Sequence, residues 1–430
     1  YFAYAARILT QTEIGVLATL SLISTLVVAT ATLALPSAVT RYIAEYTGRM
    51  EPARSKKVYQ FAALFGIASA AGFATLTIAI SGVLSGGLLG TQAYQLAVVL
   101  LGIDTFPLIL SQFFMGTLTG LQKFREIAVV AALQMITKSI LAMLFLAIGQ
   151  GVQGVVAAWI LGDSTGLSLY AAFTLRQFAE TRASDDIQKW ALFKYSAPLY
   201  VTNLVNYLAN QLDKYLVIFL LAPKLGMDKT LAQLGIYNLA IVAVSVVGMV
   251  LSSLGTTLFP QLSEKLGKTG KGAVDQASHL ASRYISMAFI PMAVGLAVVA
   301  YPTITVFVGP SYAPGSTALA IVSVATAITC LAPLVSSVLL SLGSTRVVME
   351  ASIVGIAAAV AAGYPLVQTI GINGAALTRA ALLIVGFSYG AYRLAKIHGL
   401  HIDGEALRKS CMASAALALA VVPFELLFPN

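Results

Sequence analysis

The sequence predicts an all-α polytopic membrane protein with two six-helix lobes related by a pseudo-twofold axis along the membrane normal, plus at least one extra C-terminal helix. Three observations predict this fold: composition, recurring long apolar runs and an internal duplication. Hydrophobic residues make up 58% of the 430 residues and charged residues 10%, whereas a soluble domain carries roughly 25% charged residues. Apolar runs of about 20 residues can cross the hydrocarbon core, and they are too long for barrel strands.

Breaks at Gly, Pro, Lys and Arg divide the apolar runs into one partial helix and about twelve full spans. The first helix is expected to be partial, because residues 1–9 are apolar from their start, without a charged beginning or a cleavage site. The predicted helices cover 1–9, 14–46, 58–84, 94–121, 127–148, 152–176, 193–221, 235–262, 278–308, 317–342, 348–369, 373–396 and 409–428.

Alternate loops differ in their content of Lys and Arg, which sets the orientation of a membrane protein. The loops at 85–93, 149–151, 309–316 and 370–372 contain neither residue, and only Lys224 and Lys229 depart from the alternation. We therefore expect a multi-pass protein of the cell (plasma) membrane with the basic loops in the cytoplasm. These loops carry Arg49, Arg54, Lys56, Lys57, Lys123, Arg125, Arg176, Arg182, Lys189, Lys194, Lys265, Lys268, Lys271, Arg346, Arg393, Lys396, Arg408 and Lys409.

The two halves of the chain match each other at a nearly constant offset of 219 to 221 residues. Six helices per half is an even number, so both halves enter the membrane from the same side and form a parallel repeat. The prediction is an N-terminal lobe over 1–176, a cytoplasmic linker over 177–193, a C-terminal lobe over 194–396 and an additional helix within 397–430. A substrate path is expected between the lobes. The matching pairs are Gly15 with Gly235, Gly48 with Gly267, Arg125 with Arg346, Gly151 with Gly371 and Gly154 with Gly374.

Polar residues recur along one stripe of the predicted helix 193–221, at steps of 3, 4, 3 and 1. Amides can hydrogen-bond sugar hydroxyls, and a lysine can meet a phosphate as a point charge. The stripe predicts a cavity wall, although polar packing against a neighbouring helix would produce the same pattern. Its members are Asn203, Asn206, Asn210, Asp213 and Lys214.

Ionisable side chains occur near the middle of three other spans, where each costs about 2.5 to 3.5 kcal/mol to insert. Asp104, Lys138 and Asp163 are either a cation or proton relay, with Lys138 available to an anionic head group, or a buried ion pair or triad that only stabilises the first lobe. Asp104 and Asp163 are the candidates for ion coupling, and Lys138 is a candidate for substrate binding.

Three arginines complete the cationic set: Arg7, Arg41 and Arg379. A guanidinium keeps its charge and binds phosphate oxygens bidentately, which suits a phosphate or pyrophosphate group. For Arg41, which is expected at a cytoplasmic helix end, snorkelling toward lipid head groups is the competing explanation.

Several function classes are disfavoured by the sequence. It contains no GxxxxGK[ST] or HExxH motif and no paired cysteine ligands, so we expect neither an enzyme nor a cofactor nor a metal site. The formal net charge of +9 is spread over short loops rather than gathered on one face, which disfavours nucleic acid as a partner.

The same segments resemble the oligosaccharide flippase and polysaccharide exporter branch of the MOP (multidrug, oligosaccharidyl-lipid, polysaccharide) superfamily, whose fold is MATE-like. Two departures are that Thr10 stands where that branch has Gly, and that the start of helix 1 and a possible last helix are expected to be missing. The resemblance is carried by Ala6-Arg-Ile-Leu9 with Ile14-Gly-Val16, Thr40 to Tyr46, Lys194 to Pro198, Gln211 to Lys214, Gly235-Ile-Tyr237, Phe259 to Ser263, Gly309 to Tyr312 and Gly371 to Ala376.

This resemblance implies a flippase for a lipid-linked oligosaccharide on a polyprenyl or dolichyl phosphate or pyrophosphate carrier, working by alternating access. It also implies that Arg7 and Arg41 hold the phosphate. Membrane lipids and a coupling ion, H⁺ or Na⁺, are the further partners, and the chain is expected to act as a monomer. Two alternatives stay open: a cation-coupled multidrug antiporter that depends on Asp104, Asp163 or Asp213, and a non-transporting assembly partner of a glycan polymerase.

Overall fold

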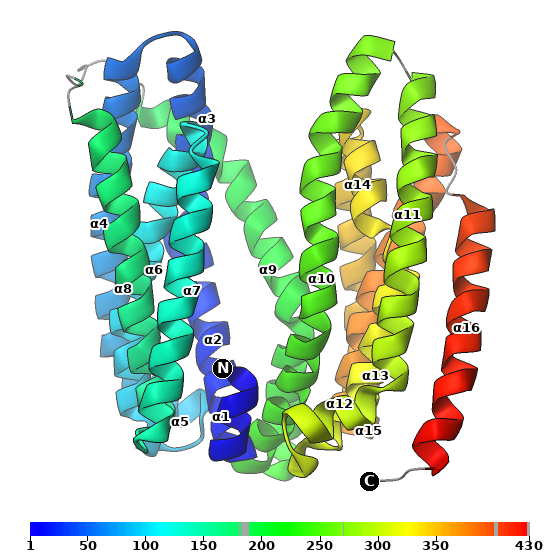
Figure 1. The fold of residues 1–430 in the computed structure, drawn as a ribbon. Helices are drawn as coiled ribbons and strands as arrows, with labels where there is room; N and C mark the ends of the chain where they lie inside the picture. The colour runs from blue at the N-terminus through cyan, green and yellow to red at the C-terminus, as the bar shows by residue number, and fades with distance from the viewer. Residues whose placement is uncertain (180, 182–188, 270, 400–402, 428–430) are drawn as a thin grey trace. The chain divides into compact units, whose positions relative to one another are not determined.

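The structure is a computed structural model that describes residues 1–179, 181, 189–269, 271–399 and 403–427. Within these ranges every regular element is an α-helix or a short 3-10 turn (Figure 1). Nine of the described helical segments are long and apolar enough to cross a membrane. The prediction of an all-α, multi-pass membrane protein is therefore confirmed.

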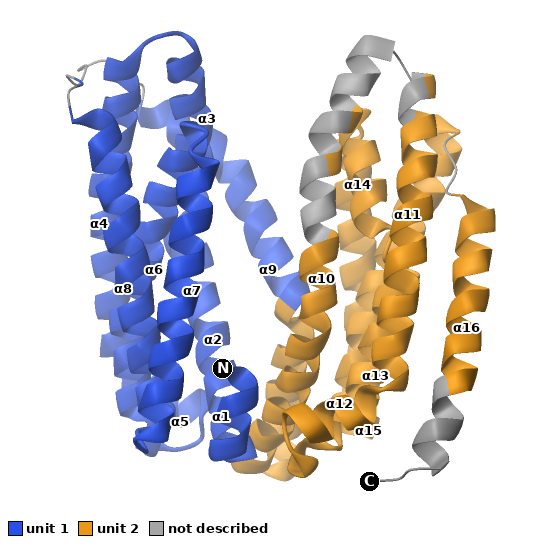
Figure 2. Cartoon of the chain, in the orientation of Figure 1, with its two compact units in different colours: residues 1–210 blue, residues 211–430 orange. Residues whose placement is uncertain are grey.

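The chain divides into two compact units, unit 1 over Tyr1–Asn210 and unit 2 over Gln211–Asn430 (Figure 2). In unit 1, α6 lies at the centre and packs against α3, α4 and α8, while α7 packs along α8. The buried core of this unit includes Ile109, Phe113 and Leu118 of α6. The elements are α1 (Phe2–Ile8), α2 (Gln11–Ala31), α3 (Leu35–Gly48), α4 (Pro52–Ala79), α5 (Ser81–Leu88), η1 (Gln92–Tyr94), α6 (Gln95–Gly120), α7 (Phe124–Ala147), α8 (Gly151–Phe178) and the beginning of α9 (Lys189–Leu225).

Thr10, the residue that departs from the resembling family, separates α1 from α2. Its backbone is extended, and its side chain accepts a hydrogen bond from the Glu13 N–H at 3.2 Å. The Glu13 carboxylate accepts one in return from the Thr10 N–H at 2.8 Å. This capping box satisfies two backbone donors that the start of α2 would otherwise leave unpaired.

The predicted helix 14–46 is wrong as a single helix, because the chain breaks between α2 and α3. Leu33 and Ala34 have φ angles of 48° and 53°, in the left-handed region, and Pro36 lies in the first turn of α3. Proline is tolerated at that position but has no N–H to continue a helix. The Ala31 carbonyl at the break accepts a hydrogen bond from the Ser69 hydroxyl at 2.6 Å. The predicted helix 317–342 breaks similarly before Pro333.

Unit 2 is built around α10, α13 and α15. Helix α10 packs against α11, α13 and α14, and α15 packs against α13 and α14. Helix α16 lies beside α11 (Figure 1). The remaining elements are α10 (Met227–Thr269), α11 (Lys271–Val298), α12 (Ala300–Phe307), η2 (Pro310–Tyr312), α13 (Gly315–Ile328), α14 (Ala332–Ser341), α15 (Thr345–His398) and α16 (Gly404–Leu427).

Helix α15 consists of two segments that reverse at Ile370 and Gly371, whose dihedral angles are not helical. The predicted helices 348–369 and 373–396 correspond to these two segments. Gly371 has a φ of +59°, and Gly151 at the matching turn of unit 1 has a φ of +57°. Gly343 and Gln122 lie at another pair of matching turns and also have positive φ angles, of +75° and +58°. Equivalent turns of the two sequence halves therefore adopt the same left-handed backbone.

The lobe boundaries predicted from the sequence remain a prediction. Along the chain, the division between the two compact units falls inside α9, between Asn210 and Gln211. Part of the predicted linker 177–193 lies outside the described residues, since 180 and 182–188 are not described. Part of the additional region 397–430 is also outside them, namely 400–402 and 428–430.

Gly374→Ala should destabilise unit 2 by about 3 kcal/mol or more, at the upper end of overpacking effects. A Cβ at this position would lie 2.1 Å from the Leu366 carbonyl oxygen, because the two segments of α15 meet there. The matched control is Gly248→Ala in α10, where an added Cβ has no atom within 4 Å and should be neutral or slightly stabilising. Unfolding of the purified variants in mixed micelles measures both. Equal stability of the two variants would contradict the close approach.

Candidate functional site

The first polar cluster lies in unit 1, between α7 and α8. Asp163 of α8 is fully buried, and its two carboxylate oxygens accept hydrogen bonds from Lys138 Nζ at 2.8 Å and Gln134 Nε2 at 2.6 Å. The close crossing of the helices brings these groups together, since a Cβ at Gly162 would lie 2.8 Å from the Lys138 Cβ. Lys138 Nζ also lies 5.9 Å from the centre of the Trp159 ring.

Asp104 of α6 adds a second carboxyl to this cluster. Its side chain is 1% exposed, and the charges of Asp163 and Lys138 act on it. Among the residues that the structure describes, its Oδ1 atom has no hydrogen-bond partner. With both carboxyls ionised, the cluster of Asp104, Lys138 and Asp163 carries one net negative charge, so it has the chemistry to hold a proton or a small cation.

The second cluster lies in unit 2 and has the opposite charge balance. Asp213 of α9 is 2% exposed and accepts hydrogen bonds from Arg379 Nη1 of α15 at 2.9 Å and from the Tyr237 hydroxyl of α10. Lys214 lies close enough for the charges of Asp213 and Arg379 to act on its ammonium group. Asp213 pairs with Arg379, and Lys214 adds a second cation nearby, so these three charged side chains together carry one net positive charge.

An open cavity of about 420 Å³ adjoins this second cluster at Arg379 and is lined by α10, α13, α14 and α15. Arg379 lies on its wall together with Ser245, Thr326 and Thr329, and most of the remaining lining is apolar. The Arg379 side chain is 20% exposed, so its guanidinium binds Asp213 while remaining accessible. Such a cavity combines apolar walls with a few polar groups, as ligand sites commonly do.

The predicted stripe on α9 divides between the two units. Asn203, Asn206 and Asn210 lie in unit 1 and are exposed, and Asn210 Nδ2 donates to the Asn206 carbonyl at 2.8 Å. Asp213 and Lys214 lie in unit 2, where the structure brings them together with Arg379. That the asparagines line a substrate cavity remains a prediction.

The two remaining predicted cations, Arg7 and Arg41, both lie in unit 1 and are exposed. The Arg41 guanidinium lies 4.4 Å from the centre of the Tyr195 ring. Guanidinium groups bind aromatic faces, so this contact helps to position the side chain, and snorkelling toward lipid head groups remains the competing explanation. The turns of α9 that flank Tyr195 line a cavity of about 630 Å³, with Trp190, Lys194 and Tyr200 among the lining residues.

Two residues of these clusters were not singled out as site residues from the sequence: Gln134 and Tyr237. Gln134 precedes Lys138 by one helical turn, so the spacing of i and i+4 placed both on one face of α7. Tyr237 belongs to the Gly235-Ile-Tyr237 segment, but its contact with Asp213 joins positions 24 residues apart. The spacing on a helix predicts neighbours on that helix and cannot predict a contact between helices.

Comparisons with known proteins agree on the fold. Residues 1–265 match the family described as "Polysaccharide biosynthesis protein". No curated protein matches the chain. An inward-facing multidrug resistance MATE family transporter of the MOP superfamily is similar with a TM-score of 0.73 at 15% identity, over 93% of this chain and 94% of that chain.

Two other solved structures share this architecture. The lipid II flippase MurJ, in an inward closed conformation, has a TM-score of 0.66 at 13% identity, over 96% of this chain and 92% of its own. A MOP superfamily transporter from Pyrococcus furiosus has a TM-score of 0.62 at 13% identity, over 92% of this chain and 91% of its own. At these identities the likeness shows the fold, which is the MATE/MOP-like fold predicted from the sequence.

Proposed function

Because the chain belongs to the polysaccharide biosynthesis protein family and has the fold of MOP superfamily transporters, we propose that it flips a lipid-linked oligosaccharide across the cell membrane. The carrier is a polyprenyl or dolichyl phosphate or pyrophosphate, moved from the cytoplasmic to the outer leaflet by alternating access. The observation that carries this proposal is the net positive charge of the Asp213 cluster, which α9, α10 and α15 build inside unit 2.

An anionic head group suits this cluster better than a cationic one. Arg379 and Tyr237 already hydrogen-bond the Asp213 carboxylate, so a cationic drug would have to displace them and meet two like charges. A phosphate instead adds a partner for the cations, and Arg379 lies on a cavity wall where a ligand can reach it. This balance favours a phosphorylated substrate over the substrates of a multidrug antiporter.

The sugar and the coupling ion are assigned to other groups. The exposed amides of Asn203, Asn206 and Asn210 offer both donors and acceptors to glycan hydroxyls. Arg7 and Arg41 supply further positive charge for the phosphate linkage. Asp104 and Asp163 hold the coupling ion, H⁺ or Na⁺, because the two carboxyls have one cationic neighbour, Lys138, and Asp104 has an oxygen that no described residue binds.

Reconstitution into liposomes tests the proposal. A fluorescent lipid-linked oligosaccharide placed in one leaflet should reach the other leaflet only in vesicles that contain the protein. We expect the initial rate to be at least about tenfold above protein-free vesicles, the equivalent of about 1.4 kcal/mol in barrier height. Collapsing an imposed H⁺ or Na⁺ gradient should lower the rate if that ion is the coupling ion.

Two results would replace the proposal with one of the alternatives. Efflux of a cationic dye that requires Asp104, Asp163 or Asp213, without transfer of the glycolipid, would identify a multidrug antiporter. Transfer of neither compound, together with retention of a co-purifying glycan polymerase, would identify an assembly partner. Dye efflux and glycolipid transfer are measured in the same vesicles, so differences in the amount of incorporated protein do not affect the comparison between these two activities.

A further inference from the structure

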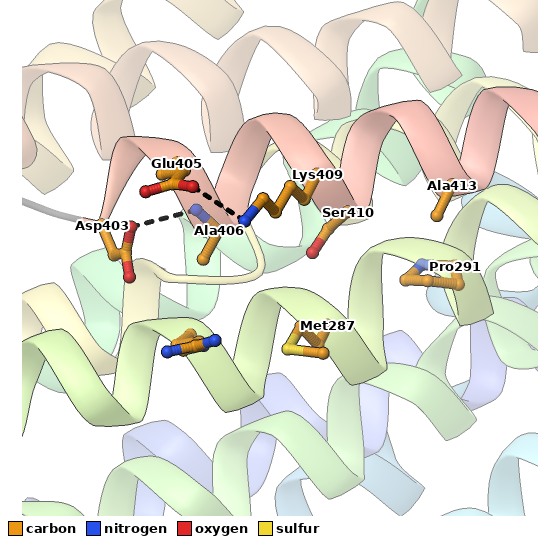
Figure 3. Close-up of a pocket in the computed structure, with 9 residues that line it drawn as sticks. Met287, Pro291, Asp403, Glu405, Ala406, Lys409, Ser410 and Ala413 are labelled. Atoms are coloured by element: carbon orange, nitrogen blue, oxygen red, sulfur yellow. Dashed lines mark hydrogen bonds and ion pairs between the residues drawn. The ribbon is translucent and has the colours of Figure 1, made fainter.

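A second pocket in unit 2, of about 350 Å³, lies between α11 and α16 (Figure 3). None of its lining residues belongs to the Asp213 cluster. Its α11 side carries Arg283, Met287 and Pro291. Its α16 side carries Asp403, Glu405, Ala406, Lys409, Ser410 and Ala413. Charged groups therefore line the beginning of α16, and apolar groups line the part that follows.

The two helices run parallel with small residues between them. Ala406, Ser410 and Ser414 recur every fourth position on α16 and are buried, as are Ser282 and Ser286 of α11. Small residues allow helices in a membrane to approach closely. The hydroxyls of Ser282, Ser286 and Ser414 donate to carbonyls of their own helices at 2.8, 3.0 and 2.7 Å.

Ser410 differs from these serines. Its side chain is 4% exposed and lines the pocket, yet its hydroxyl has no hydrogen-bond partner within the described part of the chain. Figure 3 shows the hydroxyl on the side of α16 that faces Met287 and Pro291. A buried hydroxyl without a partner loses the hydrogen bonds that it would make to water, and a ligand oxygen in the pocket would restore one of them.

The charged end of the pocket contains both signs. Arg283 and Lys409 supply two cations, and Asp403 and Glu405 supply two carboxylates. The Ala406 N–H donates to Asp403 at 3.0 Å, and this bond, with smaller contributions from His279 and Arg283, holds the pKa of Asp403 below its ordinary value. Asp403 is therefore ionised at neutral pH. Glu405 pairs with Lys409 at 2.7 Å in an exposed position.

The surroundings of the pocket are apolar. Leu280 and Tyr284 of α11 and Met412 and Leu419 of α16 are exposed large hydrophobic side chains, at 54%, 66%, 66% and 75%. Such side chains on a membrane protein suit contact with acyl chains. Asp403, Glu405 and Lys409 lie at the beginning of α16. From the positions of the basic loops, we predict that this end of α16 lies on the cytoplasmic side.

We propose that this pocket binds the head group of a zwitterionic membrane phospholipid that carries a phosphate and a primary ammonium group. The phosphate lies between Arg283 and the Ser410 hydroxyl, and the ammonium lies beside Asp403 and Glu405. The glycerol and acyl chains follow Met287, Pro291 and Ala413 into the bilayer. The lipid stabilises α16 against α11.

The balance of charge selects this chemistry. A purely anionic head group would meet the carboxylates of Asp403 and Glu405 as well as the cations, and like charges repel. A quaternary ammonium has no N–H to donate to these carboxylates, whereas a primary ammonium has three. Phosphatidylethanolamine should therefore bind more tightly than phosphatidylglycerol or phosphatidylcholine with the same acyl chains.

Native mass spectrometry of the full chain in detergent tests this proposal by titration with these three lipids. We expect phosphatidylethanolamine to bind at least about tenfold more tightly than the other two, a difference of about 1.4 kcal/mol. Arg283→Met and Ser410→Ala should each weaken its binding. Asp403→Asn should lower the preference over phosphatidylcholine, because only Glu405 then remains for the ammonium, while keeping the helix cap, since asparagine caps as well as aspartate.

Ser414→Ala is the matched control, because its hydroxyl is already bonded to the Ser410 carbonyl. It should bind phosphatidylethanolamine as the unaltered chain does. Tighter binding of phosphatidylglycerol would overturn the proposal in favour of a simple anion site. Equal binding of all three lipids, or no difference between Ser410→Ala and Ser414→Ala, would also overturn it.

Discussion

Lys138→Met is expected to lower the free energy of unfolding by about 3 to 5 kcal/mol, the range for breaking one partner of a buried ion pair. Asp163 is fully buried and pairs with Lys138 at 2.8 Å, so the substitution leaves its charge without a counter-ion. The hydrogen bond from Gln134 remains but does not neutralise the carboxylate. The nearby Asp104 carboxyl makes the site still less favourable for an uncompensated negative charge.

Unfolding in mixed micelles, followed by circular dichroism, measures this effect. Arg125→Met is the matched control, since Arg125 is an exposed cation at the beginning of the same helix, α7. The double variant Lys138→Met, Asp163→Asn should recover part of the lost stability, because Asp163 then no longer leaves an unpaired buried charge. A Lys138→Met variant as stable as Arg125→Met would contradict the ion pair.

Lys214→Met is expected to reduce transfer of lipid-linked oligosaccharide at least about tenfold, or about 1.4 kcal/mol in transition-state stabilisation. Asp213 keeps Arg379 as its partner at 2.9 Å, so the substitution removes the net positive charge of the cluster without exposing an unpaired carboxylate. Folding should therefore be largely preserved while the attraction for a phosphate is lost. This separates an effect on substrate from an effect on stability.

The control for Lys214 lies on the same helix. Lys224 is exposed near the end of α9, where its Nζ donates to the Gln368 carbonyl at 3.3 Å. Lys224→Met should transfer the glycolipid at the rate of the unaltered protein in the same liposome assay. If Lys214→Met and Lys224→Met have equal rates, the Asp213 cluster does not bind the substrate, and the argument from its net charge fails.

Local patterns in the sequence were sufficient to predict the helices but not their breaks. Hydropathy over 14–46 gave one continuous helix, whereas the structure ends α2 at Ala31 and begins α3 at Leu35. The left-handed backbone at Leu33 and Ala34 has no signal in these residue types, although Pro36 lies shortly after them. Their conformation depends on neighbours such as Ser69, which bonds the Ala31 carbonyl.

The sequence by itself determined that the chain is a multi-pass membrane protein built from long apolar helices, because the cost of burying charge in hydrocarbon acts on each residue separately. One matching pair, Gly151 and Gly371, lies at matching turns with a positive φ, which few other residues adopt. Only the tertiary structure decided that Lys138 pairs with Asp163 and Arg379 with Asp213. These pairs join different helices, and the close approach that creates them is set by packing between helices rather than by spacing along one of them.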